Sequence, residues 1–188
     1  MLLRAGHPEQ AIGWLRDALQ ARPDDLQAMV AFGAACVRCG RPSDAELAMR
    51  RAALARPDLP ELQANLGNLL RDLRRLPEAE RCLSSALVAH PADPDLHNNL
   101  GTVLQDAGRR QAAERCFRRA LRHQPDHAPA LENLGRSLLD TGHHRAAIEF
   151  LSKLVQAHPG LASGHFRLGV AYRCLGALGL AEGSLRQA

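Results

Sequence analysis

The amino-acid sequence predicts an all-α fold made of helix hairpins that repeat along the chain. Three residue types recur at a fixed interval of 34 residues across the 188-residue chain. The members of these series are Pro23, Pro57, Pro91, Pro125 and Pro159, then Gly33, Gly67, Gly101, Gly135 and Gly169, and finally Ala11, Ala45, Ala79, Ala113, Ala147 and Ala181. A constant period of this length is typical of architectures in which one small helical element is repeated.

The first half of each repeat has the features of a helix that begins near a proline and ends at a glycine. In the repeat 94–127 the apolar positions with helical spacing are Leu96, Leu100, Val103 and Leu104. Proline suits the first helical position, where no amide hydrogen is needed, and Pro60 and Pro94 both stand there. The glycines expected to end these helices are Gly40, Gly108, Gly142 and Gly176. Arg74 replaces this glycine in one repeat, so its turn should be tighter or strained.

A second helix should follow each turn and pack against the first. In the repeat 94–127 its inner face carries Ala113, Phe117, Ala120 and Leu121, and the helix closes just before Pro125. Gly101 in the first helix and Ala113 in the second recur in register because paired helices cross closely at these small residues. Each repeat is therefore a helical hairpin.

The period divides the chain into full and partial repeats of one solenoid over residues 1–188. The full repeats are 26–59, 60–93, 94–127 and 128–161, while 1–25 is a partial repeat and 162–188 a truncated one. No polar capping helix follows the last repeat, although solenoids normally need capped ends for solubility. We therefore expect a segment of a longer protein, or ends that associate through apolar residues such as Leu178, Leu180 and Leu185.

Composition and charge point away from a membrane protein. Aromatic residues make up only 3% of the chain and hydrophobic residues 46%, so the core must rest on Leu, Ala and Val. The net charge is +4, and 23 of the 24 basic residues are arginine, which suggests a GC-rich bacterial gene. No apolar run approaches the roughly 18 residues of a membrane span, and the first ten residues lack a signal-like apolar segment. We expect a cytoplasmic protein without a membrane partner.

The repeat pattern resembles that of the tetratricopeptide repeat family, over essentially the whole chain. The residues that carry the resemblance are Leu100, Gly101, Leu104, Ala113, Phe117, Ala120 and Pro125. The resemblance implies a right-handed superhelical solenoid, an α-α superhelix, whose first helices line a concave groove. Members share a binding architecture rather than one ligand, so the resemblance itself does not identify a partner.

The reactive side chains do not form a recognisable catalytic, cofactor or metal motif. Cys36 and Cys39 make a C-x-x-C, but no second pair accompanies them, and Cys36 occupies a core position that leucine fills in other repeats. The nine histidines do not cluster, and neither a Gly-rich phosphate loop nor a Ser-His-Asp grouping can be placed. We therefore expect no enzymatic activity, no cofactor, no metal site and reduced thiols.

Arginines concentrate on the predicted second helices, whose outer side should face solvent. The residues are Arg50, Arg51, Arg115, Arg118, Arg119 and Arg122. Glu46 precedes Arg50, and Glu114 precedes Arg118, by four residues, the favourable order for an ion pair within a helix. A nucleic-acid ligand would instead need a basic concave face with stacking aromatic residues, so we expect none.

An asparagine directly before Leu-Gly recurs in three successive first helices, as Asn65, Asn99 and Asn133. The family resemblance places this position in the concave groove. A primary amide both donates and accepts hydrogen bonds, so it can hold the backbone of an extended peptide. The alternative is that these amides only bond to adjacent helices. Other groove residues that would add selectivity are Asn68, Asn98 and Arg136.

Three aspartates lie seven residues beyond these asparagines, two helical turns along the same face. Asp72, Asp106 and Asp140 would give the groove a second row of polar groups. Negative charge is unfavourable near a helix C-terminus, so a ligand role competes with simple neutralisation by nearby arginines such as Arg71 and Arg109.

The predicted function is a non-enzymatic scaffold that binds a partner protein or an extended peptide. The asparagine series also resembles the asparagine ladder of the O-linked N-acetylglucosamine transferase superhelix and its bacterial relatives. The alternative function is therefore the substrate-recruiting arm of a larger enzyme, a glycosyltransferase or sulfotransferase, which the coding sequence beyond Ala188 would reveal. A clamp for acidic chaperone tails is disfavoured, because Ala64, Pro129 and Asn133 stand where its basic residues are expected.

Overall fold

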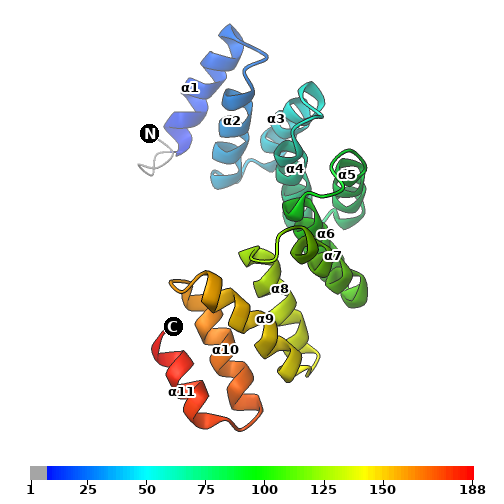
Figure 1. The fold of residues 1–188 in the computed structure, drawn as a ribbon. Helices are drawn as coiled ribbons and strands as arrows, with labels where there is room; N and C mark the ends of the chain where they lie inside the picture. The colour runs from blue at the N-terminus through cyan, green and yellow to red at the C-terminus, as the bar shows by residue number, and fades with distance from the viewer. Residues whose placement is uncertain (1–7) are drawn as a thin grey trace. The chain divides into compact units, whose positions relative to one another are not determined.

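The computed structural model describes residues 8–188, which fold into eleven α-helices (Figure 1). The helices are α1 (Pro8–Ala21), α2 (Leu26–Arg38), α3 (Pro42–Ala55), α4 (Pro60–Asp72), α5 (Leu76–Ala89), α6 (Pro94–Asp106), α7 (Arg110–His123), α8 (Ala128–Asp140), α9 (His144–Ala157), α10 (Ala162–Cys174) and α11 (Leu178–Arg186). No strand occurs within residues 8–188, and the predicted all-α class of helix hairpins is confirmed. None of the described helices is long and apolar enough to cross a lipid bilayer.

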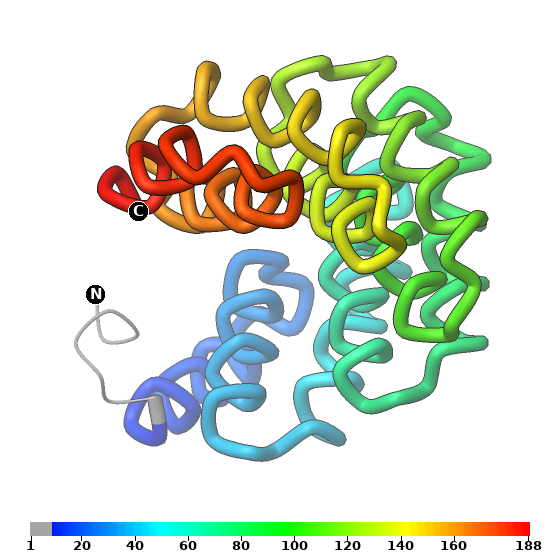
Figure 2. Tube along the Cα trace, turned by 90° about the horizontal axis from the view of Figure 1, so that it is seen from below, coloured from blue at the N-terminus to red at the C-terminus, as the bar shows by residue number. Residues whose placement is uncertain are grey.

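The helices begin where the 34-residue period indicates, and short turns separate them along the Cα trace (Figure 2). The first helices of the last five hairpins start at Leu26, Pro60, Pro94, Ala128 and Ala162, the predicted repeat boundaries. Asp25 and Asp93 cap α2 and α6, because each carboxylate accepts a hydrogen bond from the amide three residues on, at 2.9 Å. The first-helix tail predicted before α1 lies outside the described residues.

The chain divides into two compact units, Met1–Pro91 and Ala92–Ala188, called the N-terminal and C-terminal units below. In the N-terminal unit each helix from α1 to α5 packs on the next, and in the C-terminal unit each helix from α6 to α11 does so. In the C-terminal unit α8 also contacts α6 and α10, so these three first helices lie side by side. The second helices α7 and α9 pack against α8.

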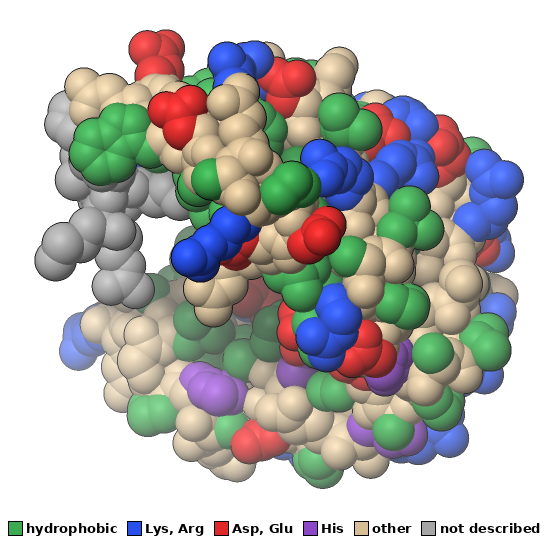
Figure 3. Space-filling model, turned by 90° about the horizontal axis from the view of Figure 1, so that it is seen from above, with side chains coloured by type: hydrophobic (Ala, Val, Ile, Leu, Met, Phe, Trp, Pro, Cys, Tyr) green, Lys and Arg blue, Asp and Glu red, His purple; other side chains and the backbone are tan. Residues whose placement is uncertain are grey.

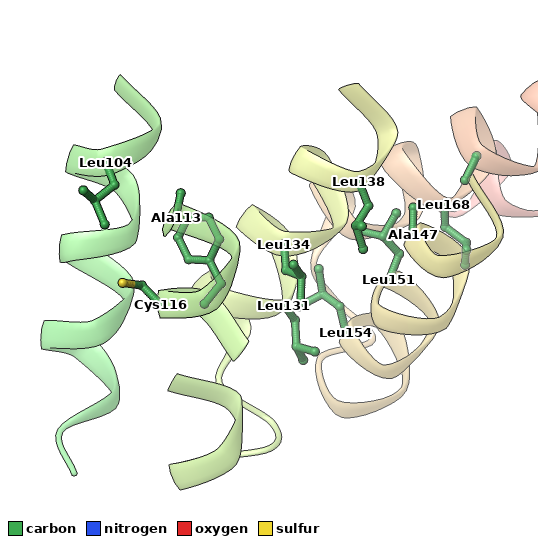
Figure 4. Packing of buried hydrophobic residues seen from close by; sticks show 12 residues of the cluster. Leu104, Ala113, Cys116, Leu131, Leu134, Leu138, Ala147, Leu151, Leu154 and Leu168 are labelled. Atoms are coloured by element: carbon green, nitrogen blue, oxygen red, sulfur yellow. The ribbon is translucent and has the colours of Figure 1, made fainter. Parts of the chain in front are cut away.

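Leucine and alanine fill the core, as the composition predicts. In the C-terminal unit Leu131 and Leu134 of α8 lie between the side chains of α7 and those of α9 (Figure 4). Phe117 and Leu151 are fully buried within the same cluster. A smaller cluster in the N-terminal unit includes Cys36, which is fully buried and so occupies the core position expected for it. Burial raises the pKa of the Cys36 thiol, and none of the five cysteines, all of which lie within residues 8–188, forms a disulfide.

The recurring glycine of each first helix lies where the paired helices meet, as predicted. A Cβ atom added at Gly101 would lie 2.5 Å from Cε1 of Phe117, far inside van der Waals contact. At Gly67 and Gly135 the added atom would lie 2.7 Å and 2.6 Å from a leucine side chain. At Gly33 the neighbour is the flexible Met49 side chain, at 3.1 Å.

The turn after each first helix needs a left-handed residue, which is usually glycine. Gly40, Gly108, Gly142 and Gly176 have φ between 66° and 77°, and Arg74 takes the same conformation with φ of 61°. The following amide then bonds back to the helix, as in Arg75 N to Leu70 O at 2.9 Å. The expected strain at Arg74 is therefore real, because a side chain disfavours this region.

Replacing Arg74 with glycine should stabilise the N-terminal unit. Relief of the left-handed strain is worth about 1–2 kcal/mol, and the greater freedom of glycine in the unfolded chain removes part of it, so we expect a net gain of about 1 kcal/mol. Urea unfolding measures the change. Gly108→Ala, the reverse change at the equivalent turn of the C-terminal unit, should lower stability by a similar amount. An Arg74→Gly variant no more stable than the native chain would show that the turn stores no strain.

Four charged side chains link neighbouring second helices in the N-terminal unit. Arg50 of α3 pairs with Glu46 at 2.8 Å and with Glu78 of α5 at 3.3 Å. Arg75 in turn pairs with Glu78 at 2.7 Å and with Glu46. In the C-terminal unit Arg118 pairs with Glu114 at 3.0 Å, so both predicted helix pairs form. Figure 3 shows basic and acidic side chains intermixed on the face in view.

This network should make the stability of the N-terminal unit fall in acid. Burial opposes ionisation of Glu46, but the hydrogen bonds from Arg50 and Arg75 outweigh it and hold the Glu46 pKa below its ordinary value of 4.5. A hydrogen bond from Arg75 likewise lowers the pKa of Glu78. Because both folded-state pKa values are depressed, their contribution is complete above pH 4.5 and is lost as the pH falls through them.

Glu46→Gln should therefore flatten the acid limb of a stability-against-pH curve measured by urea unfolding. Glu61→Gln is the matched control, because the exposed Glu61 carboxylate forms no ion pair among the described residues. Equal acid limbs in Glu46→Gln and the native chain would mean that the network does not stabilise the fold.

The last hairpin leaves apolar side chains uncovered. Leu178 and Leu180 of α11 are 68% and 58% exposed, and Leu185 is 39% exposed. Helix α11 has nine residues, whereas the other second helices have fourteen. The sequence-based expectation of incomplete apolar cover at these three positions is confirmed for the described residues.

Candidate functional site

The predicted groove residues fall into both compact units. Asn65, Asn68 and Asp72 lie on α4 of the N-terminal unit. Those on α6 and α8 of the C-terminal unit are Asn98, Asn99, Asp106, Asn133, Arg136 and Asp140. Helices α6, α8 and α10 lie side by side, and we call the side of the C-terminal unit that carries this set the first-helix face. It comprises Asn98, Asn99, Asp106, Asn133, Arg136 and Asp140 together with Phe166 and Arg167 of α10.

Asn133 connects two helices through its side chain. Its Nδ2 donates to Oδ1 of Asn98 at 2.9 Å, and its own Oδ1 accepts from Nη2 of Arg136 at 3.1 Å. Asn98 is only 6% exposed, so this hydrogen bond satisfies a buried amide oxygen. For Asn133, bonding to an adjacent helix, the alternative considered from the sequence, is therefore realised.

The other two asparagines of the series behave differently. The side chains of Asn65, which is exposed, and Asn99, which is half-buried, make no hydrogen bond within residues 8–188. Their amides keep both a donor and an acceptor for an incoming ligand. Asn68 is also half-buried, and its Oδ1 is buried without a partner among the described atoms. Of the three recurring asparagines, Asn133 alone ties two helices together within the described residues.

The connection made by Asn133 recurs one repeat later with charged residues. Nε of Arg167 on α10 pairs with Oε1 of Glu132 on α8 at 3.1 Å. Arg167 stands at the asparagine position of the last repeat, and Glu132 stands at the position of Asn98. Both links join residues 35 positions apart, one more than the sequence period. Aligning the repeats at their 34-residue period therefore does not place the two residues of each pair at the same repeat position.

A pocket of about 240 Å³ lies between α8 and α10 on the first-helix face. Its lining residues are Arg136, Leu139, Asp140, His144, Phe166, Arg167, Val170 and Cys174. Phe166 is 55% exposed and offers an apolar contact. Nε of Arg136 and Nδ1 of His144 are buried without a hydrogen-bond partner in the described chain. The pocket therefore combines an apolar contact with an unsatisfied N–H donor, a pairing that suits a peptide carbonyl beside an apolar side chain.

Sequence reasoning identified Arg136 and Asp140 but missed Phe166, Arg167 and His144. Phe166 and Arg167 occupy the positions of Glu132 and Asn133 in the next repeat. Their positions in the period would have been enough to identify them as residues of this face. They were missed because Phe and Arg stand there in place of Glu and Asn. No three His, Cys, Asp or Glu side chains are arranged to hold a metal ion anywhere in residues 8–188.

The aspartate row lies at the C-terminal ends of the first helices. Asp72, Asp106 and Asp140 are the last residues of α4, α6 and α8, and all three are exposed. Asp72 pairs with Arg71 at 2.9 Å, so at this position neutralisation by a neighbouring arginine occurs. Asp140 instead lines the pocket between α8 and α10, where it lies with Arg136 and Arg167.

Family models described as tetratricopeptide repeat match most of the chain. One model matches residues 64–109 and 98–162, and a second matches residues 2–69. A search of curated protein sequences finds no significant match.

Many solved structures share this arrangement of helices. PilW, described as a widely conserved type IV pilus biogenesis factor, is 24% identical over 99% of this chain and 86% of its own, with a TM-score of 0.82. PilF of Pseudomonas aeruginosa is 20% identical over 97% of this chain and 83% of its own, with a TM-score of 0.79. YrrB, described as a TPR protein with an unusual peptide-binding site, is 20% identical over 92% and 89%, with a TM-score of 0.61. At these identities the likeness establishes a shared fold.

Proposed function

We propose that this chain, which belongs to the tetratricopeptide repeat family, is a non-enzymatic scaffold that binds an extended peptide of a partner protein. The binding surface is the first-helix face of the C-terminal unit. The observation that carries the proposal is the pocket between α8 and α10, which is lined both by Arg136, whose buried Nε–H has no partner in the described chain, and by the exposed Phe166. YrrB, a neighbour in fold, is described as having a peptide-binding site, which is consistent with this function.

An extended peptide matches the chemistry of this face. Its backbone offers a carbonyl and an amide at every residue, and the free amide of Asn99 can bond to either. Extended chain advances about 3.3–3.6 Å per residue, while packed helices lie about 8–10 Å apart. One backbone contact per first helix would thus fall at about every third peptide residue. Phe166 would contact an apolar side chain between two such backbone contacts.

The test uses a peptide selected from a random display library by the native protein, with affinity measured by fluorescence anisotropy. The double variant Asn99→Ala, Phe166→Ala should bind it at least about tenfold more weakly, because a hydrogen bond is worth about 0.5–1.5 kcal/mol and apolar burial adds to it. Neither side chain ties one helix to another by a hydrogen bond, so circular dichroism should show an intact fold.

The matched control is Gln111→Ala, Leu178→Ala, which removes one exposed amide and one exposed apolar side chain elsewhere in the C-terminal unit. Its affinity for the selected peptide should equal that of the native chain. Equal weakening by both double variants, or failure of the display to select any peptide, would contradict the proposed function.

A second function uses the same face. The asparagine series Asn65, Asn99 and Asn133 is also compatible with a substrate-recruiting arm of a larger glycosyltransferase or sulfotransferase. Both functions require peptide binding at the first-helix face, so the display experiment supports either. A catalytic domain encoded beyond Ala188 would favour the enzyme arm, and a stop codon would favour the separate scaffold.

We expect the exposed leucines of α11 to allow self-association. Exposed apolar patches favour contact between molecules, and Leu178 and Leu180 are more than half exposed. We expect light scattering to show a mass that rises with protein concentration, and Leu178→Glu with Leu180→Glu to abolish the rise. A strict monomer at every concentration would contradict this expectation.

A further inference from the structure

A second, larger pocket lies on the side of the C-terminal unit that is formed by the second helices. It has a volume of about 590 Å³ and opens between α7 and α9, above Leu131 of α8. The residues that line this α7–α9 pocket are Arg115, Arg118, Arg119, Leu121, Arg122, Pro125, Leu131, Phe150 and Lys153. None of them belongs to the first-helix face.

The rim of the α7–α9 pocket is strongly basic. Five of its nine lining residues are Arg or Lys, and none is acidic. Arg118 pairs with Glu114, and Lys153 pairs with Glu149 at 2.9 Å. The other three arginines, which are Arg115, Arg119 and Arg122, are exposed and make no ion pair within the described residues. The rim therefore holds positive charge that the described chain does not neutralise.

The floor of the pocket is apolar. It is formed by Leu121, Pro125, Leu131 and Phe150. Leu131 is 1% exposed, and Leu121 and Phe150 are half-buried against the same core cluster, whereas Pro125 is exposed. Three of the four apolar side chains are thus buried or half-buried while the arginines of the rim are exposed, an arrangement that admits an inserted side chain.

An equivalent groove in the N-terminal unit shows that repeat packing does not require these features. It opens between α3 and α5 with a volume of about 450 Å³ and lies two repeats earlier, at residues 68 positions lower. Gln63 and Cys82 stand there in place of Leu131 and Phe150. Arg50, the equivalent of Arg118, pairs with both Glu46 and Glu78. The earlier groove also has the buried Leu66 and Leu70 in its lining, but it includes the acidic Glu78, and Leu54 stands there in place of Arg122, so its rim is less basic than that of the α7–α9 pocket.

We propose that the α7–α9 pocket binds an acidic peptide segment of a partner protein, anchored by one large apolar side chain. The peptide carboxylates would pair with Arg115, Arg119 and Arg122, while the apolar side chain would enter the pocket and contact Leu131 and Phe150. Bidentate pairing with carboxylates is the geometry to which arginine is suited. This surface is separate from the first-helix face, so one molecule can hold two segments at once.

The same observations favour a peptide over other anionic partners. Single-stranded nucleic acid needs exposed aromatic faces for stacking, but Phe150 is half-buried and the Lys153 ammonium lies over its ring, 5.4 Å from the centroid. Membrane surfaces favour apolar side chains that project outward, whereas Leu131 here is buried and Leu121 and Phe150 are half-buried. An acidic chain with a protruding Leu or Phe uses both the rim and the floor.

The test is a fluorescence anisotropy titration of the full chain with a labelled peptide of alternating Glu and Ser around a central Leu-Phe. We expect binding that weakens with salt, and at least about tenfold weaker binding of the same peptide with Ser-Ser at its centre. Arg115→Glu with Arg122→Glu should weaken binding by at least about tenfold. The matched control, Arg145→Glu with Arg173→Glu, makes the same change of charge at exposed positions outside the pocket and should bind as the native chain does.

Three results would overturn the proposal. Equal affinity for the Leu-Phe and Ser-Ser peptides would show attraction by charge alone. Equal weakening by the two charge-reversal variants would show that the pocket is not the site. Tighter binding of an oligodeoxythymidine of equal charge, or of phosphatidylglycerol vesicles, would assign the basic rim to nucleic acid or to membrane. The peptide selected for the first-helix face should bind the Arg115→Glu, Arg122→Glu variant normally, so the two sites can fail independently.

Discussion

Gly101→Leu should lower the free energy of unfolding by about 1–3 kcal/mol or more, because it overpacks the crossing of α6 and α7. Even the first added carbon would lie 2.5 Å from the ring of Phe117, which is fully buried. The ring belongs to a core cluster that also contains the buried Leu104 and Leu134, so moving it would disturb their packing. Thermal or urea unfolding of the variant measures the loss. An unchanged transition would show that the close crossing is not at this residue.

Gly33→Ala is the control for helix propensity. Alanine favours a helix over glycine by about 1 kcal/mol, and the methyl group would meet the flexible Met49 side chain at 3.1 Å and the backbone oxygen of Ala45 at 3.6 Å, an ordinary contact distance. We therefore expect Gly33→Ala to be neutral or stabilising and Gly101→Ala to be destabilising. The same sign for both alanine variants would contradict the account of why the repeated glycine is required.

Asn133→Ala should lower stability by about 1–3 kcal/mol, because it leaves the buried Oδ1 of Asn98 without its partner. Asn99→Ala should change stability by less than about 0.5 kcal/mol, because the Asn99 side chain makes no hydrogen bond within residues 8–188. Urea unfolding of both variants provides the comparison. Equal effects of the two substitutions would mean that the link between α6 and α8 does not contribute to the fold.

This difference determines how the asparagine series can be tested for ligand binding. A triple variant at Asn65, Asn99 and Asn133 would combine the loss of ligand contacts with the loss of the link to Asn98. The double variant Asn65→Ala, Asn99→Ala removes only the amides that have no intramolecular partner. If the amides hold a peptide, the double variant weakens binding while the unfolding transition stays in place.

Much of the fold could be predicted because each hairpin has the same helix start, close helix contact and turn at the same positions of the 34-residue period. The 34-residue period placed the start of α6 at Pro94 and identified Gly101 as the close contact with the second helix. It also identified Arg74 as the residue forced into a left-handed turn. These features depend on local geometry within one hairpin, which the sequence of that hairpin determines.

The contacts between hairpins were harder to predict. Asn133 meets Asn98, and Arg167 meets Glu132, at a separation of 35 residues, so neither pair is aligned in the sequence period. The pocket beside Phe166 needs side chains from α8, α9 and α10 together. Whether a side chain in the asparagine position ties two helices therefore depends on the residue 35 positions earlier, which is Asn98 for Asn133 and Ala64 for Asn99.

The central claim is that the first-helix face of the C-terminal unit binds an extended peptide, and NMR of the side-chain N–H groups tests it most directly. On addition of the display-selected peptide, we expect the Nε–H signal of Arg136 and the amide signals of Asn99 to shift, because each gains a hydrogen-bond partner. The Nε–H signals of Arg115 and Arg122 in the α7–α9 pocket should stay in place. Shifts confined to those arginines, with the Arg136 and Asn99 signals unchanged, would contradict the claim.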